Sequence, residues 1–169
     1  MKLLFPLLFL LALNLPLAAG AAETAAASDP PAPTEPRIYV KRVKMDFARA
    51  YQRVFTGLEN NGYFVILEPN MGRNLAHFAQ RWGENYNRSM LEQFRSIVFC
   101  NGWYANEIGN RDPDLLALCP LHLTLIHKEG ITSVLFVRPS QVAAHSPAKA
   151  VATELEQDIV RVIEEALSR

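Results

Sequence analysis

The residues best suited to chemistry in this chain lie in one short stretch that holds both cysteines and a histidine. Cys100 and Cys119 are the two cysteines of the 169 residues, and His122 follows the second of them closely. Thiolate and imidazole groups bind copper and zinc, and a pair of thiols can form a disulfide or take part in redox exchange. The spacing is far from Cys-x-x-Cys, so a thioredoxin-like role is not expected.

Three states of the cysteine pair are open: a structural disulfide, two separate buried thiols, or a pair that is redox-active or binds metal. The sequence favours a disulfide between Cys100 and Cys119, because two cysteines in a small exported domain usually pair. His122 and His127 are an odd number of residues apart on an expected strand, so they point to opposite faces and cannot share an ion. No short-spaced ligand pair occurs, so no metal or cofactor is predicted.

The turn that follows Cys100 is the best candidate for a binding surface. Asn101-Gly102 reverses the chain, and Trp103 and Tyr104 come next, so an aromatic pair could anchor a partner or a small ligand, with His122 at the start of the following strand. The alternative is that the two aromatic residues make core or dimer contacts. A second polar-aromatic segment, residues 81–88, is an equally open candidate.

The sequence favours a non-enzymatic role, although it leaves an enzyme open. It contains no Gly-x-Ser-x-Gly, Walker or dinucleotide-binding motif, so hydrolysis and nucleotide chemistry have no motif to support them. Asp112 and Asp114 are typical of a turn and a helix N-cap. A serine and a distant histidine could still assemble in space, which keeps a hydrolase among the alternatives.

The beginning of the chain predicts export. Residues 1–21 resemble a cleavable signal peptide, with Lys2, an apolar run and the small residues Ala19-Gly20-Ala21. An uncleaved membrane anchor is the alternative, but Pro6 and Pro16 interrupt the run. We therefore expect a periplasmic or secreted protein with no stable membrane insertion after cleavage.

The next segment, residues 22–36, is rich in alanine and proline and is expected to be a disordered tether. A single folded domain should span residues 37–169. Removal of residues 1–21 leaves 16 basic and 17 acidic side chains, a balance that gives no reason to expect nucleic-acid binding.

The pattern of apolar residues predicts an α+β fold in the order β-α-β-α-β-α-β-β-α. A largely antiparallel sheet with helices packed on one face accommodates this order. The expected strands span residues 38–43, 63–67, 94–100, 121–126 and 131–137; the expected helices span residues 46–61, 75–82 and 103–110, with a helical turn at 112–118 and a long helix from Ser146-Pro147 to the C-terminus.

Residues 45–142 resemble the bacterial family known as domain of unknown function 302. The matching features are Cys100-Asn101, Asp112-Pro113, the hairpin 123–137, Arg138-Pro139 and the helix-to-strand corner 58–65. The resemblance implies a small α+β domain that pairs as a homodimer, and it implies no agreed reaction.

Together these observations predict an exported α+β domain that binds a partner or small ligand without catalysis. Its tentative surface comprises Asn101, Trp103, Tyr104 and His122. The alternative is a periplasmic redox or metal-handling protein that uses Cys100, Cys119 and His122.

Overall fold

The computed structural model describes residues 36–168 of the chain. The predicted signal peptide and all of the predicted tether except Pro36 lie outside this range. The strands are β1 (Ile38–Val43), β2 (Phe64–Leu67), β3 (Gln93–Cys100), β4 (Leu121–Lys128) and β5 (Ile131–Val137); the helices are α1 (Phe47–Asn60), α2 (Met71–Ala76), α3 (Ala79–Trp82), α4 (Gly102–Arg111), α5 (Pro139–Val142) and α6 (Lys149–Leu167), with 3-10 helices at Gly83–Asn85 and Pro113–Leu118.

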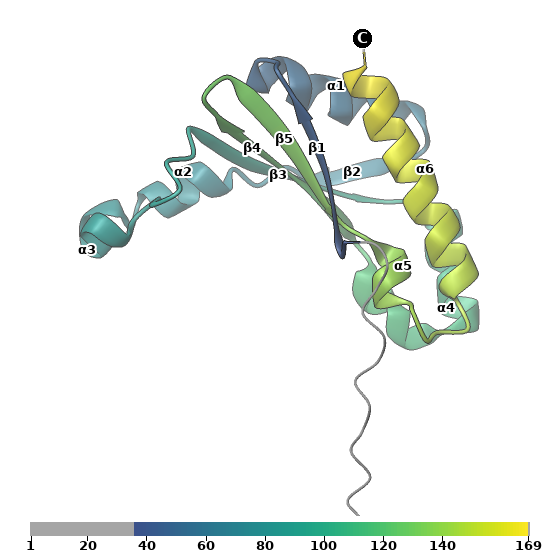
Figure 1. Ribbon diagram of the computed structural model, residues 1–169. Coiled ribbons are helices and arrows are strands. Elements are labelled where there is room, and N and C mark those ends of the chain that lie inside the picture. Colours follow the sequence, from purple (N-terminus) through teal and green to yellow (C-terminus); the bar gives the residue numbers. More distant parts are fainter. Residues whose placement is uncertain (1–35, 169) are drawn as a thin grey trace, which may run out of the picture. The chain divides into compact units, whose positions relative to one another are not determined.

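The strands form one five-stranded sheet in the order β1-β5-β4-β3-β2, and every neighbouring pair is antiparallel (Figure 1). Helices α1 and α6 pack together on one face of this sheet. The predicted α+β fold with an antiparallel sheet is therefore confirmed. None of the helices among residues 36–168 is long and apolar enough to cross a membrane.

The core lies between the sheet and helices α1, α4 and α6. Alternate strand residues enter it: Ile97 and Phe99 of β3 are buried, as are Leu123 and Leu125 of β4. Helices α1 and α6 approach closely, since a Cβ atom on Gly57 would lie 3.2 Å from Cγ1 of Val162. The other side of the core comes from Phe47, Ala50, Val54, Leu58, Ile108, Leu155, Ile159, Val162 and Ile163.

Two local signals placed α1 and the hairpin correctly. The Asp46 side chain accepts a hydrogen bond from the Arg49 amide at 3.1 Å, which is the contact of a helix N-cap. Gly62 follows the helix with φ of +77°, and Gly130 in the β4–β5 turn has φ of +76°. Both positions use the left-handed conformation that glycine adopts without steric cost.

Two helix boundaries differ from the prediction. The helix expected at residues 75–82 is two short helices, because Asn70 caps an earlier start at α2 and the chain turns between α2 and α3. The last helix begins at Lys149, after the uncapped Ala148. The Ser146 hydroxyl still makes a capping contact in the turn before the helix, because it accepts from the Ala148 amide at 3.0 Å, and it also donates to Asp112 at 2.5 Å.

Candidate functional site

The structure brings the two cysteines together. Cys100 is the last residue of β3 and Cys119 lies two residues before β4, and their Sγ atoms are 3.2 Å apart as free thiols. A disulfide requires about 2.05 Å between the sulfur atoms. The proximity expected of a bonded pair is therefore present, and the bond itself stays a prediction.

Folding makes the Cys119 thiol harder to ionise. Burial raises its pKa to about 11, and the hydrogen bond and the charge interaction with Cys100 add to the effect. Because the thiolate is the nucleophile and the metal ligand, a reduced Cys119 is a weak candidate for either role at neutral pH.

His122 lies on β4, outside the hydrophobic core. It opposes Val98 across β3 and β4, and its side chain is exposed on the sheet face that α1 and α6 leave uncovered. No group of three His, Cys, Asp or Glu side chains within residues 36–168 could hold a metal ion. The arrangement needed for a metal site at Cys100, Cys119 and His122 is therefore not formed there.

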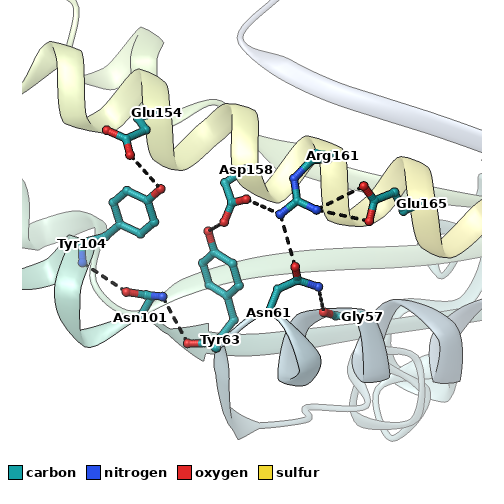
Figure 2. Close-up of polar contacts among 10 residues, drawn as sticks. Gly57, Asn61, Tyr63, Asn101, Tyr104, Glu154, Asp158, Arg161 and Glu165 are labelled. Atoms are coloured by element: carbon teal, nitrogen blue, oxygen red, sulfur yellow. Dashed lines mark hydrogen bonds and ion pairs between the residues drawn. The ribbon is translucent and has the colours of Figure 1, made fainter.

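Asn101 fixes the turn after β3, as Figure 2 shows. Its Oδ1 atom accepts hydrogen bonds from the amides of Trp103 at 3.0 Å and Tyr104 at 3.2 Å, so it is the N-cap of α4. Its Nδ2 atom donates to the carbonyl of Gly62 at 3.1 Å. One side chain thus ties the start of α4 to the turn between α1 and β2. We name residues 101–104 the Asn101 corner.

The two aromatic residues of the Asn101 corner have different environments. Trp103 is 56% exposed and meets the ring of Tyr104 edge to face, with centroids 4.9 Å apart. Tyr104 is half-buried, and its hydroxyl lies 3.5 Å from the Glu154 carboxylate. Burial, with a smaller contribution from Glu154, raises the Tyr104 pKa. Tyr104 therefore acts as a support, and Trp103 is the residue available for contact.

A polar network next to the Asn101 corner joins α6 to the turn between α1 and β2 (Figure 2). The buried Tyr63 donates to Asp158 at 2.7 Å, and Asp158 accepts from Arg161 at 2.5 Å. Arg161 also donates to Asn61 at 3.2 Å and pairs with Glu165 at 3.1 Å. We did not identify these residues from the sequence, although the i,i+3 and i,i+4 spacing from Asp158 to Arg161 to Glu165 is typical of paired charges on a helix.

Beside the cysteines there is a small apolar cavity of about 20 Å³. Cys100, Tyr104, Ile108, Leu118 and Cys119 are among its lining residues. A space of this size holds about one water molecule. This cavity is therefore too small for an organic ligand, and the Asn101 corner offers its exposed surface instead.

Comparison with known proteins gives a family and a fold. The family model described as "Domain of unknown function DUF302" matches residues 39–166. The chain belongs to this family. The match extends beyond residues 45–142, where we saw the resemblance in the sequence, and includes β1 and most of α6.

A crystal structure of an uncharacterized conserved DUF302 protein from Bacillus stearothermophilus is similar to this chain, with a TM-score of 0.67 and 17% sequence identity. The match covers 78% of this chain and 99% of the other. At this identity the likeness establishes the fold alone. No curated protein matches the chain.

Proposed function

We propose that this member of the DUF302 family is an exported, non-enzymatic domain that binds a protein partner at the Asn101 corner. The observation that supports this most directly is the exposed indole of Trp103 on a backbone held by Asn101. Export is supported by the sequence of residues 1–21 alone. The cavity beside the corner is too small for a small ligand, which favours a partner that contacts Trp103 from outside.

The corner has the properties of an interface anchor. Tryptophan is enriched among the residues that dominate binding energy, and an anchor whose position is fixed before binding loses little conformational entropy. The backbone of Trp103 is fixed by Asn101, and its ring rests on Tyr104. An exposed indole therefore meets a partner without reorganisation of the chain.

A disulfide between Cys100 and Cys119 is part of the proposal. The bond would join the end of β3 to the segment before β4 and close the loop that contains the Asn101 corner. Closing a loop of this length stabilises a fold by about 3 kcal/mol in the chain-entropy model. In this role the sulfur atoms support the surface and do no chemistry.

The alternative is a redox protein that uses the same two thiols, which the distance of 3.2 Å between the sulfur atoms favours. The raised pKa of Cys119 disfavours it. Thiol titration and metal analysis of protein purified from the periplasm separate the two. A complete disulfide without bound metal supports the structural role, whereas free thiols or a stoichiometric metal would support the alternative.

The homodimer implied by the family resemblance also belongs to the proposal. Large apolar side chains are exposed on the two edge strands, among them Ile38 on β1 and Phe64 and Leu67 on β2. Analytical ultracentrifugation over a range of protein concentrations tests it. A single species with the mass of one chain at micromolar concentration would remove the homodimer from the proposal.

Site-specific photo-crosslinking tests the partner surface. A photoreactive phenylalanine analogue at position 103 should give a defined crosslinked species in cells that export the protein. The same analogue at Lys44, which is exposed beside the β4–β5 turn at the other end of the sheet, is the control. Equal crosslinking at both positions, or none at position 103 in a folded and exported protein, would locate binding away from the Asn101 corner.

A further inference from the structure

The segment between β2 and β3 forms one side of a groove that is separate from the Asn101 corner. We name residues 70–91, which contain α2, α3 and the 3-10 helix Gly83–Asn85, the arm. Figure 1 shows the arm projecting from the sheet on the side away from α6. None of the residues in α2, α3 or the 3-10 helix is buried. The arm is therefore held mainly by its attachment to β3 and by its own turns.

Between the arm and the start of β3 there is a groove of about 490 Å³. This volume is within the range of about 300–1,000 Å³ that is common for small-molecule sites. Its walls combine apolar and aromatic side chains with amides and one arginine. The residues that matter for recognition are Leu75, Trp82, Tyr86, Arg88, Leu91 and Phe94.

Specific contacts maintain the shape of the groove. Asn87 closes the last turn of the arm, since its Oδ1 atom accepts from the Leu91 amide and its Nδ2 atom donates to the Leu91 carbonyl, both at 2.9 Å. On the opposite side, Gly72 lies against β3, because a Cβ atom there would be 3.4 Å from the backbone nitrogen of Phe94. The groove is therefore formed before any ligand enters.

The base of the arm is also fixed to the β4–β5 hairpin. The Glu92 amide donates to the carbonyl of His127 at 2.9 Å, and its carboxylate accepts from the Glu129 amide at 2.8 Å. The other carboxylate oxygen lies 3.7 Å from Nε2 of His127. Glu92 lines the groove, but its charge is directed to these partners.

Arg88 places in the groove a guanidinium that has no ion-pair partner among residues 36–168, and it shares the lining with the carboxylate of Glu92. The arm carries Arg73, Arg81 and Arg88 against the single acid Glu84. None of these arginines makes an ion pair with another residue in the range 36–168, and Arg88 is the one that lines the groove. An anionic group is the natural complement of such a guanidinium.

The apolar part of the lining suits an aromatic or branched apolar body. The indole of Trp82 is 40% exposed and stacks on Phe78, with ring centroids 5.0 Å apart and planes at 18°. This stacking holds the indole in place, and Tyr86 and Leu75 extend the apolar lining. Planar and apolar groups gain free energy from contact with such a wall.

We propose that the groove between the arm and β3 binds a small organic anion with an aromatic or branched apolar body. Arg88 pairs with the anionic group, and Trp82, Tyr86 and Leu75 contact the body. This site is separate from the Asn101 corner. It requires neither export nor a protein partner, so either proposal can fail without the other.

The two tryptophans of the chain distinguish the two sites in one experiment. The probe is 1-anilinonaphthalene-8-sulfonate, titrated into the ¹⁵N-labelled full-length protein. The indole N–H signals of Trp82 and Trp103 are followed by NMR and assigned with Trp103→Phe. We expect a saturable shift of the Trp82 signal and little change at Trp103. A shift confined to Trp103, or no saturable shift, would overturn the proposal.

Arginine variants and a matched probe test the recognition of charge. We expect Arg88→Gln to weaken binding of the sulfonate probe about fivefold, the upper end for an exposed charge pair. N-phenyl-1-naphthylamine has the same aromatic body without the sulfonate, and its affinity should not change. Arg73→Gln, on the arm but outside the groove, is the control and should leave both affinities unchanged.

An equal loss in Arg73→Gln would mean that the arm attracts anions without a defined site. Equal weakening of the neutral probe by Arg88→Gln would mean that Arg88 shapes the groove and does not bind the anion. A midpoint that shifts with protein concentration would place the probe between two copies of the chain. Each of these results contradicts the proposed site, and unchanged amide spectra confirm that the variants are folded.

Discussion

The Asn101 corner and the arm each expose a tryptophan, but the chain holds the two regions by different means. The corner rests on the buried Tyr63 and on the network that joins it to α6. The arm buries no residue of its helices and depends on local turns. Buried packing resists local opening better than exposed hydrogen bonds do. The comparison therefore teaches that the corner is held by the core, whereas the shape of the arm depends on its own local contacts and is lost more easily.

The largest expected difference in the free energy of unfolding comes from removing one aromatic side chain in each region. Tyr63→Ala empties a fully buried site against Phe99, whose ring centroid is 5.7 Å away, and leaves Asp158 with Arg161 as its remaining donor. We expect a loss of about 3–5 kcal/mol in the free energy of unfolding. Trp82→Ala in the arm should cost under about 1 kcal/mol, as for other exposed sites.

Urea unfolding followed by circular dichroism measures both values, because the signal comes from all helices. Tyr63→Phe is the intermediate control, since it keeps the packing and removes only the hydroxyl. Similar losses for Tyr63→Ala and Trp82→Ala would mean that the arm is as integral to the core as the corner is, and the proposed contrast would be wrong.

A smaller difference in the free energy of unfolding is expected when each of two helix-capping asparagines is replaced by alanine. Asn101 caps α4 and also donates a hydrogen bond to the carbonyl of Gly62. Asn70 caps α2 by accepting one hydrogen bond, from the Arg73 amide at 2.9 Å. Asn101→Ala should lower the free energy of unfolding by about 1–2 kcal/mol. Asn70→Ala should lower it by about 0.5 kcal/mol or less, because the arm can open locally without unfolding the domain.

The same urea experiment compares the two caps. Asn101→Asp keeps the acceptor for the α4 amides and loses the amide donor to Gly62, so it separates capping from bridging. If Asn70→Ala proved as destabilising as Asn101→Ala, the arm would have to unfold together with the core.

The difference between the two regions also explains what could be predicted from the sequence. Helix α1 and the β4–β5 hairpin follow from local patterns: apolar spacing, Asp46 at the start and glycine at the turns. The same patterns predict that Cys100 ends one strand and Cys119 precedes the next, and the two sulfur atoms are close together in the structure. In these places local preference and tertiary packing agree.

Other features depend on contacts that no local pattern contains. The spacing of Leu75, Phe78, Ala79 and Trp82 predicts one continuous apolar helix face. The structure instead has two helices, α2 and α3, with a break at residues 77–78. The Tyr63–Asp158 bond joins residues far apart in the sequence, so it exists only after α6 packs on the sheet. The groove likewise depends on Asn87 folding the chain back to Leu91.

The smallest expected effect is the dependence of the free energy of unfolding on pH, to which the cysteine beside the Asn101 corner contributes. Burial raises the pKa of Tyr63, with its hydrogen bond to Asp158 as the second cause, and burial raises that of Cys119 to about 11. A group whose pKa is raised by folding stabilises the fold fully below its ordinary pKa, and this contribution is lost as the pH rises through the raised value. The ordinary values are about 8.5 for the thiol and about 10 for tyrosine.

The free energy of unfolding of the reduced protein should therefore begin to fall near pH 9, where an unfolded Cys119 ionises first. In a protein with the Cys100–Cys119 disulfide the thiol no longer titrates, so the fall should begin near pH 10, with Tyr63 and the other tyrosines whose pKa burial raises: Tyr39, Tyr51 and Tyr104. Urea unfolding with and without reductant between about pH 7 and 11 measures both onsets. In Cys119→Ser the free energy of unfolding should begin to fall at the same pH as in the oxidised protein, both with and without reductant. Identical onsets in the reduced and oxidised wild-type protein would show that folding does not raise the pKa of Cys119.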